Sequence, residues 1–155
     1  MDHWNILERS ILMTTCHVSA IEKTVQKTHE WLREIVNDTD LRDQSQAWSV
    51  LRVVLLTLRD RLTEDEAVQL GAQLPTLIRG MYYEGWKPAM EPTRLHTRDE
   101  FLAVVHEGIR TIEPIDAAHA VKAVFKLLGQ RISWGEVEDV AHLLPPEIRN
   151  LWPPI

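Results

Sequence analysis

Two stretches of equal length decide the fold: residues 63–75, which read TEDEAVQLGAQLP, and residues 133–145, which read SWGEVEDVAHLLP. Each begins with a hydroxyl residue, carries glutamate three positions later and ends in Leu-Pro. A hydroxyl residue followed by glutamate at that spacing is the capping box that starts an α-helix, and proline ends a helix because it lacks a backbone donor and clashes with the preceding turn. We therefore expect one helix to start after Thr63 and another after Ser133, each ending at its proline.

These stretches belong to a longer internal duplication with an offset of 70 residues. Positions 27–82 match positions 97–152 without a gap and share eleven identical residues. In the first copy the identical residues are Glu30, Leu32, Ala47, Val54, Leu58, Arg61, Glu66, Leu74, Pro75, Ile78 and Arg79. Self-similarity at a fixed offset indicates two copies of one structural unit.

A further helix is expected at the start of each copy. Over residues 19–36, apolar residues step by four and three along one face and form an amphipathic stripe of Ile21, Val25, Leu32 and Ile35, with Thr28 in register. Residues 19–22 (SAIE) have the form of a capping box, as do residues 97–100 (TRDE) at the start of the counterpart.

The middle helix of each copy is expected to be central. Residues 44–61 are apolar nearly all round, with a narrow polar seam of Ser45, Ser49, Arg52 and Arg59. The equivalent seam in the second copy is His119, Lys122 and Lys126. A helix that is apolar on most sides is covered by neighbouring helices, so only these seams are expected to stay in contact with water.

The predicted fold is all-α, with two tandem three-helix repeats packed into one bundle-like domain that spans residues 18–155. Repeat 1 covers about residues 18–83 and repeat 2 about residues 97–153. Residues 84–96 contain Gly, two Pro and polar residues and form the linker. Residues 1–17 are either a short helix through Trp4, Leu7 and Ile11 or a loosely held extension.

Several motifs of the chain resemble the bacterial family known as domain of unknown function 2267. They are residues 24–32 (TVQKTHEWL), 58–62 (LRDRL), 73–75 (QLP), 79–86 (RGMYYEGW) and 144–153 (LPPEIRNLWP). They occur in order over nearly the whole chain. The resemblance implies a small, all-helical bacterial protein, and it brings no reaction, cofactor or functional residue with it.

Composition excludes several classes of function. The 155 residues are 45% hydrophobic with a net charge of −6, which repels a phosphate backbone, so we expect no nucleic-acid partner. The most apolar stretch, residues 50–62, is interrupted by charged residues, so no membrane insertion is expected. The single Cys16 allows no intrachain disulfide, and the sequence starts without the pattern of a secretory signal, which favours a cytoplasmic location.

No catalytic, cofactor-binding or metal site is predicted. Asp116 with His119, and Asp139 with His142, have the i, i+3 spacing of metal-binding helices, but their counterparts in the first copy are Gln46 with Ser49 and Gln69 with Ala72. Cys16 and His17 are sequence neighbours that point in different directions on a helix. Arg61, Glu66 and Arg79 recur as Arg131, Glu136 and Arg149 beside helix ends, which favours a structural role. The sequence thus gives no sign of an enzyme.

The two copies differ most at residues 80–86 (GMYYEGW), which lead into a Pro-containing loop, whereas the second copy stops at residues 150–152 (NLW). Aromatic residues with polar tips, together with methionine, are typical of interfaces, so Met81, Tyr82, Tyr83 and Trp86 are one candidate surface. The alternative is that Tyr82 and Trp86 fill the seam between the two repeats.

The exposed seam adds Arg52 and Lys122 as further candidates. These features favour a non-enzymatic protein-protein interaction module that binds another protein or itself. The alternative function is a small apolar ligand-binding protein with a pocket between the repeats, lined by Trp48, Tyr82 and Trp86.

Overall fold

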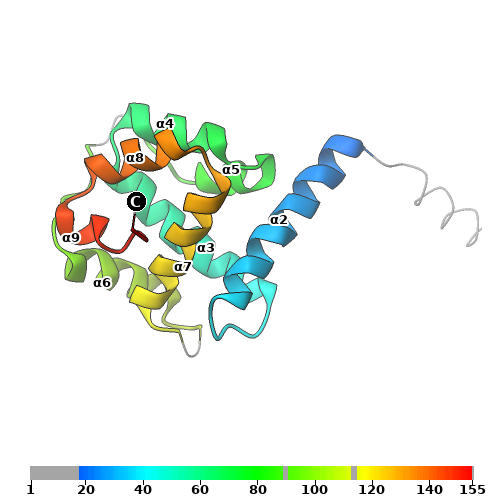
Figure 1. The fold of residues 1–155 in the computed structure, drawn as a ribbon, viewed down its shortest axis with the longest axis horizontal. Coiled ribbons are helices and arrows are strands. Elements are labelled where there is room, and N and C mark those ends of the chain that lie inside the picture. Colours follow the sequence, from blue (N-terminus) through cyan, green and yellow to red (C-terminus); the bar gives the residue numbers. More distant parts are fainter. Residues whose placement is uncertain (1–17, 89–90, 113–114, 155) are drawn as a thin grey trace, which may run out of the picture.

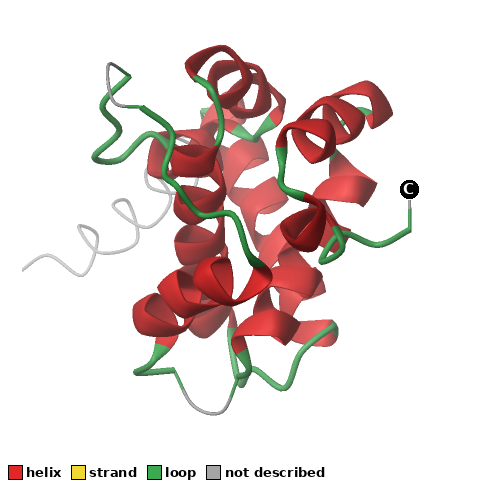
Figure 2. Cartoon of the chain, turned by 90° about the vertical axis from the view of Figure 1, so that its left-hand side faces the viewer, coloured by secondary structure: helices red, strands yellow, loops and turns green. Residues whose placement is uncertain are grey.

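The computed structural model describes residues 18–88, 91–112 and 115–154. These residues form helices joined by turns and loops, with no β-strand among them (Figures 1 and 2). The expectation of an all-α protein is therefore confirmed. The two alternatives for residues 1–17 concern a segment outside the described residues.

The helices follow the predicted order along the chain (Figure 1). They are α2 (Ser19–Asn37), α3 (Gln44–Arg61), α4 (Glu64–Gln73), α5 (Thr76–Tyr82), α6 (Arg98–Ile109), α7 (Ala117–Arg131), α8 (Trp134–Leu143) and α9 (Pro146–Arg149). After α8, the last helical turn, α9, ends at Arg149.

Only one of the predicted capping boxes is complete. In α6, Thr97 accepts a hydrogen bond from the Glu100 amide, and the Glu100 carboxylate accepts one from the Thr97 amide. Bonds from the His96 and Thr97 amides lower the pKa of Glu100. In α4 and α8, the hydroxyls of Thr63 and Ser133 accept from the amides of Glu66 and Glu136 at 3.5 and 3.3 Å, but the glutamates form no return bond.

The predicted box at residues 19–22 is wrong. Val18 occupies the N-cap position of α2, and no side chain caps this helix end. Valine has no oxygen with which to accept a bond from the first amides, so the start of α2 depends on backbone bonds from Ile21 and Glu22 to the Val18 carbonyl.

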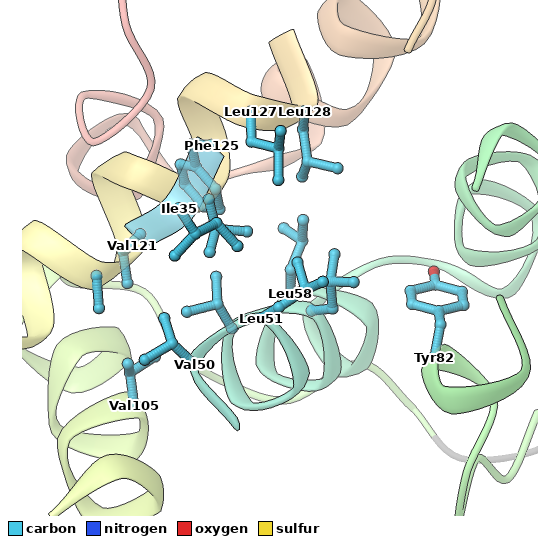
Figure 3. Packing of buried hydrophobic residues seen from close by; sticks show 14 of the residues in the cluster. Ile35, Val50, Leu51, Leu58, Tyr82, Val105, Val121, Phe125, Leu127 and Leu128 are labelled. Carbon is cyan, nitrogen blue, oxygen red and sulfur yellow. The ribbon is translucent and has the colours of Figure 1, made fainter. Parts of the chain in front are cut away.

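The core lies where α2, α3, α6 and α7 meet. Helix α3 packs against α2, α6 and α7, and α6 also packs against α7. Ile35 of α2, Leu51 of α3, Val105 of α6 and Phe125 of α7 are almost fully buried, and their side chains converge in Figure 3. The central position predicted for α3 follows from this packing.

Polar contacts fix the C-terminal half of α2 to α7. Lys126 forms an ion pair with Asp38 at 3.0 Å, and the His119 ring bonds to the Asp38 carbonyl at 2.9 Å. Arg131 pairs with Glu34, which raises the pKa of the guanidinium. These contacts all involve residues 34–38, at the C-terminal end of α2 and its cap, so they hold that end of the helix on α7.

Candidate interaction surfaces

Two of the predicted surface residues belong to the core. Met81 is 3% exposed and Tyr82 is fully buried. The Tyr82 hydroxyl donates a 2.7 Å hydrogen bond to the Ala67 carbonyl of α4, and burial of the ring raises the pKa of Tyr82. The prediction that Met81 and Tyr82 form part of a surface is therefore wrong, because α5 turns both side chains toward the body.

The other two aromatic residues are half-buried. The Tyr83 ring centroid lies 5.0 Å from that of Tyr82, in an edge-to-face arrangement, and 5.3 Å from that of Trp86, with the two rings tilted, so the three rings form a continuous series that emerges from the core. The Arg59 guanidinium donates to the carbonyls of Tyr82 and Glu84 at 2.6 and 2.8 Å. These bonds fix the backbone of the segment from within.

Arg59 was predicted in the exposed seam of α3 and is instead 4% exposed. Its charge is balanced by an ion pair with Asp60 at 2.8 Å and by the two carbonyls. Arg52 of the same seam is exposed and forms a 3.2 Å ion pair with Glu84. Lys122 is exposed on α7. Arg52 and Lys122 remain candidate contact residues, whereas Arg59 has a structural role.

The three aromatic residues proposed for an apolar ligand pocket do not line a common cavity beside Trp86. The cavity there has a volume of about 100 Å³ and is lined by Trp86 with polar and charged residues such as Arg59, Asp60 and Glu91. Tyr82 is sealed in the core, and Trp48 packs against the core from its edge. Among the described residues, the positions of these three aromatic side chains therefore do not favour the ligand-binding alternative.

The rings of the two histidines with metal-like spacing bond to backbone carbonyls, His119 to Asp38 and His142 to Glu138. The Asp116 carboxylate caps α7 by accepting from the His119 amide, and the His142 ring bonds to the Glu138 carbonyl at 2.7 Å. Within residues 18–88, 91–112 and 115–154, no three His, Cys, Asp or Glu side chains are grouped so that they could hold a metal ion. Over the same ranges, no helix combines the length and apolar character needed to cross a membrane.

The N-terminal half of α2 is an exposed apolar surface that the sequence analysis did not select. Figure 1 shows this half extending away from the other helices. Val18, Ile21 and Val25 are 57%, 59% and 38% exposed. They lie on the same apolar stripe as Leu32 and Ile35, which are buried. The spacing of the apolar residues indicated this stripe in the sequence. The sequence does not show, however, which part of the stripe packs against other helices and which part stays exposed.

A cavity of about 480 Å³ separates this half of α2 from the turn between α4 and α5. Its α2 wall includes Lys23 and Lys27, and its other wall includes Gln73 and Pro75. A hydrogen bond from the Leu77 amide to the Thr24 hydroxyl joins the two sides at 2.9 Å. The projecting half of α2 is thus connected to α5 by a polar contact.

Two carboxylates meet inside the contact between α4 and α8. Glu136 is 7% exposed, and its Oε1 and the Oε2 of Glu66 are buried without a hydrogen-bond partner among the described residues. Burial raises the pKa of Glu136, with further contributions from Glu66 and Asp139. Burial, Asp139 and Asp65 likewise raise the pKa of Glu66. Neither carboxylate returns to the cap of its own helix or pairs with a described arginine, because both turn into the helix contact.

Fold and surfaces together define a small all-helical protein with a projecting amphipathic helix and a carboxylate-rich helix pair. The chain belongs to the family described as uncharacterized conserved protein (DUF2267), whose model matches residues 28–151. The resemblance seen in the sequence motifs is confirmed by this match. No curated protein matches the chain.

Proposed function

We propose that this protein is a non-enzymatic protein-protein interaction module that associates through the projecting half of α2. The observation that carries the proposal is the apolar stripe of that helix. Leu32 and Ile35 are 5% and 1% exposed, whereas Ile21 and Val25 on the same face are 59% and 38% exposed. The stripe has the form of a helix face that is completed by a partner.

The occupant that we propose for this face is the same face of a second copy. A twofold dimer brings one surface patch against itself, and an aliphatic stripe with Val18 at its end is self-complementary in this way. Fully burying one such side chain is worth about 1.5–3 kcal/mol relative to leaving it exposed. Val18, Ile21 and Val25 from each copy would contribute part of this amount, which favours association of the two projecting helices and offsets part of the entropy lost on association.

Light scattering coupled to size-exclusion chromatography tests this proposal. The full chain is compared over a series of concentrations with the double variant Ile21→Ser, Val25→Ser. The matched control is Val104→Ser, which removes an aliphatic side chain that is 45% exposed on α6. We expect a dimer for the full chain and the control and a folded monomer for the double variant. A full chain that stays monomeric, or a double variant that still dimerises, contradicts the proposal.

We also infer that the fold consists of two tandem three-helix repeats offset by 70 residues, in one bundle-like domain with a linker at residues 84–96. Two observations support this. The bounds of α4 and α8 differ by 70 residues at both ends. Arg79 donates to the carbonyls of Gly71, Ala72 and Leu74, and Arg149 donates to those of Ala141, His142 and Leu144, at distances of 2.8–3.2 Å.

A further inference from the structure

The negative charge of this protein is concentrated on two helices that pack against each other. Helices α4 and α8 lie side by side at the top of Figure 1. They carry no Lys or Arg and six acidic residues: Glu64, Asp65, Glu66, Glu136, Glu138 and Asp139. Since the whole chain has a net charge of −6, the remaining residues balance to zero. We call these two helices the acidic pair.

No described residue neutralises the carboxylates of the acidic pair through an ion pair. Carboxylates elsewhere do have such partners: Glu34 pairs with Arg131, Asp38 with Lys126, and Glu84 with Arg52. The charge on α4 and α8 therefore projects from the molecule without local compensation.

The centre of the acidic pair lacks positive charge as well as hydrogen-bond donors. Glu136 faces Glu66 and Asp139, and Glu66 also faces Asp65. From α5, Tyr82 lies near Glu136, but its hydroxyl donates to Ala67. A buried oxygen without a donor costs about 1–3 kcal/mol, and more when the group is charged. The half-buried Glu66 side chain can turn outward, and a cation or donor brought by another molecule would then remove the cost at its Oε2.

The acidic pair also exposes large apolar side chains. Val68 of α4 is 46% exposed, and Trp134 and Leu143 of α8 are 55% and 40% exposed. Beside Trp134, a groove of about 300 Å³ is lined by Val137, Trp152 and Pro153 among others. Carboxylates interleaved with apolar side chains are complementary to a segment that carries lysine or arginine on one face and aliphatic residues on the other.

We propose that the acidic pair docks a cationic amphipathic segment of another protein, with lysine or arginine side chains on the carboxylates of α4 and α8 and an apolar side chain beside Trp134. This inference rests on the proposed function as an interaction module, but it uses a different surface from α2. Nucleic acids and the anionic surfaces of membranes are repelled by the same carboxylates, so the complementary partner is a basic protein segment.

The test uses fluorescence anisotropy with the full chain and a labelled synthetic helix that has lysine on one face and leucine on the other. The face variant is Glu66→Gln, Glu136→Gln, Asp139→Asn. A second variant, Glu64→Gln with Asp65→Asn, changes only exposed residues and leaves the buried carboxylates intact. The control variant, Glu91→Gln, Asp99→Asn, Glu107→Gln, removes the same number of negative charges as the face variant from exposed positions outside the acidic pair. Circular dichroism checks that every variant is helical.

We expect the face variant to bind the lysine helix at least about tenfold more weakly than the wild type. The second variant, which changes only Glu64 and Asp65, should lose several-fold in affinity, as for loss of close charge pairs. The control is expected to bind within about twofold of the wild type, because distant exposed charges are largely screened by salt. Absence of binding to the wild type, or equal weakening by the control and face variants, overturns the proposal. Equal binding of a helix with glutamate in place of lysine, or displacement of the lysine helix by millimolar Mg²⁺ but not by matched ionic strength, also overturns it.

This test and the light-scattering test fail independently. If the chain dimerises through α2 and the lysine helix does not bind, only the acidic-pair inference is rejected. If the lysine helix binds the acidic pair of a monomeric chain, the α2 proposal is rejected and the acidic-pair inference stands.

Discussion

Gly108 allows α6 to approach α3, so replacing it with alanine should separate these helices. A Cβ at position 108 would lie 2.6 Å from Val53 Cγ1, 3.0 Å from Cγ2 and 3.4 Å from Cβ. The two methyl groups of Val53 are the atoms that are too close, whereas its Cβ is at the edge of ordinary contact. Overpacking of this kind costs about 1–3 kcal/mol, and alanine recovers about 1 kcal/mol of helix propensity. The net expectation for Gly108→Ala is a loss of about 1 kcal/mol, or about 2–4 °C in Tm for a chain of this size.

Gly129 provides the matched control. It also lies within a helix, but a Cβ there meets only Trp152 Nε1, at an ordinary contact distance of 3.7 Å. Gly129→Ala should therefore raise the free energy of unfolding by about 1 kcal/mol. Urea unfolding followed by circular dichroism measures both variants.

Val53→Ala should rescue Gly108→Ala. In the Val53→Ala background the clashing methyl groups are gone, so adding Gly108→Ala should stabilise the protein instead of destabilising it. If Gly108→Ala is as stable as Gly129→Ala in the wild-type background, the close packing of α3 on α6 is refuted.

Three further predictions concern buried polar groups and can be measured by urea unfolding. Tyr82→Phe leaves the Ala67 carbonyl without its hydroxyl donor and should lose about 1 kcal/mol, whereas Tyr83→Phe should change stability little because its hydroxyl bond is exposed and 3.5 Å long. Arg79→Ala and Arg149→Ala each remove bonds to three carbonyls and should destabilise by similar amounts, about 2 kcal/mol each; clearly unequal losses would count against the repeat architecture. Because burial raises the pKa of Glu136 above its ordinary value of 4.5, the wild type loses stability as pH rises through that raised value, whereas glutamine does not titrate. The stability of Glu136→Gln relative to the wild type should therefore rise as the pH increases above 4.5, and a difference that does not change with pH would contradict the burial of this carboxylate.

The helices could be predicted because their signals are local. Hydroxyl caps at Thr63 and Ser133, the breaks at Pro75 and Pro145, and the apolar periodicity of α3 all act within a few residues. Local signals also have a limit: the glutamates of the two capping boxes could return to the backbone or enter the contact between α4 and α8. Tertiary packing of these two helices decides between the two positions.

The side chains that were misplaced depend on contacts distant in sequence. In the sequence pattern Arg59 looks like an exposed charge on α3. Its burial is favourable because its guanidinium donates hydrogen bonds to the carbonyls of Tyr82 and Glu84, which are distant in sequence. Residues 82 and 83 are both tyrosine, yet the first is fully buried and the second only in part. A sequence pattern that marks aromatic residues as interface-like does not distinguish these two environments.

Amide hydrogen exchange along α2, measured at increasing protein concentration, tests the central claim most directly. If a second copy covers Ile21 and Val25, exchange at residues 19–26 should slow as concentration rises, because a dimer protects that half of the helix from opening. Exchange at residues 30–36, which are already packed on the body, should change much less. Exchange rates at residues 19–26 that stay constant over the whole concentration range would contradict association through α2.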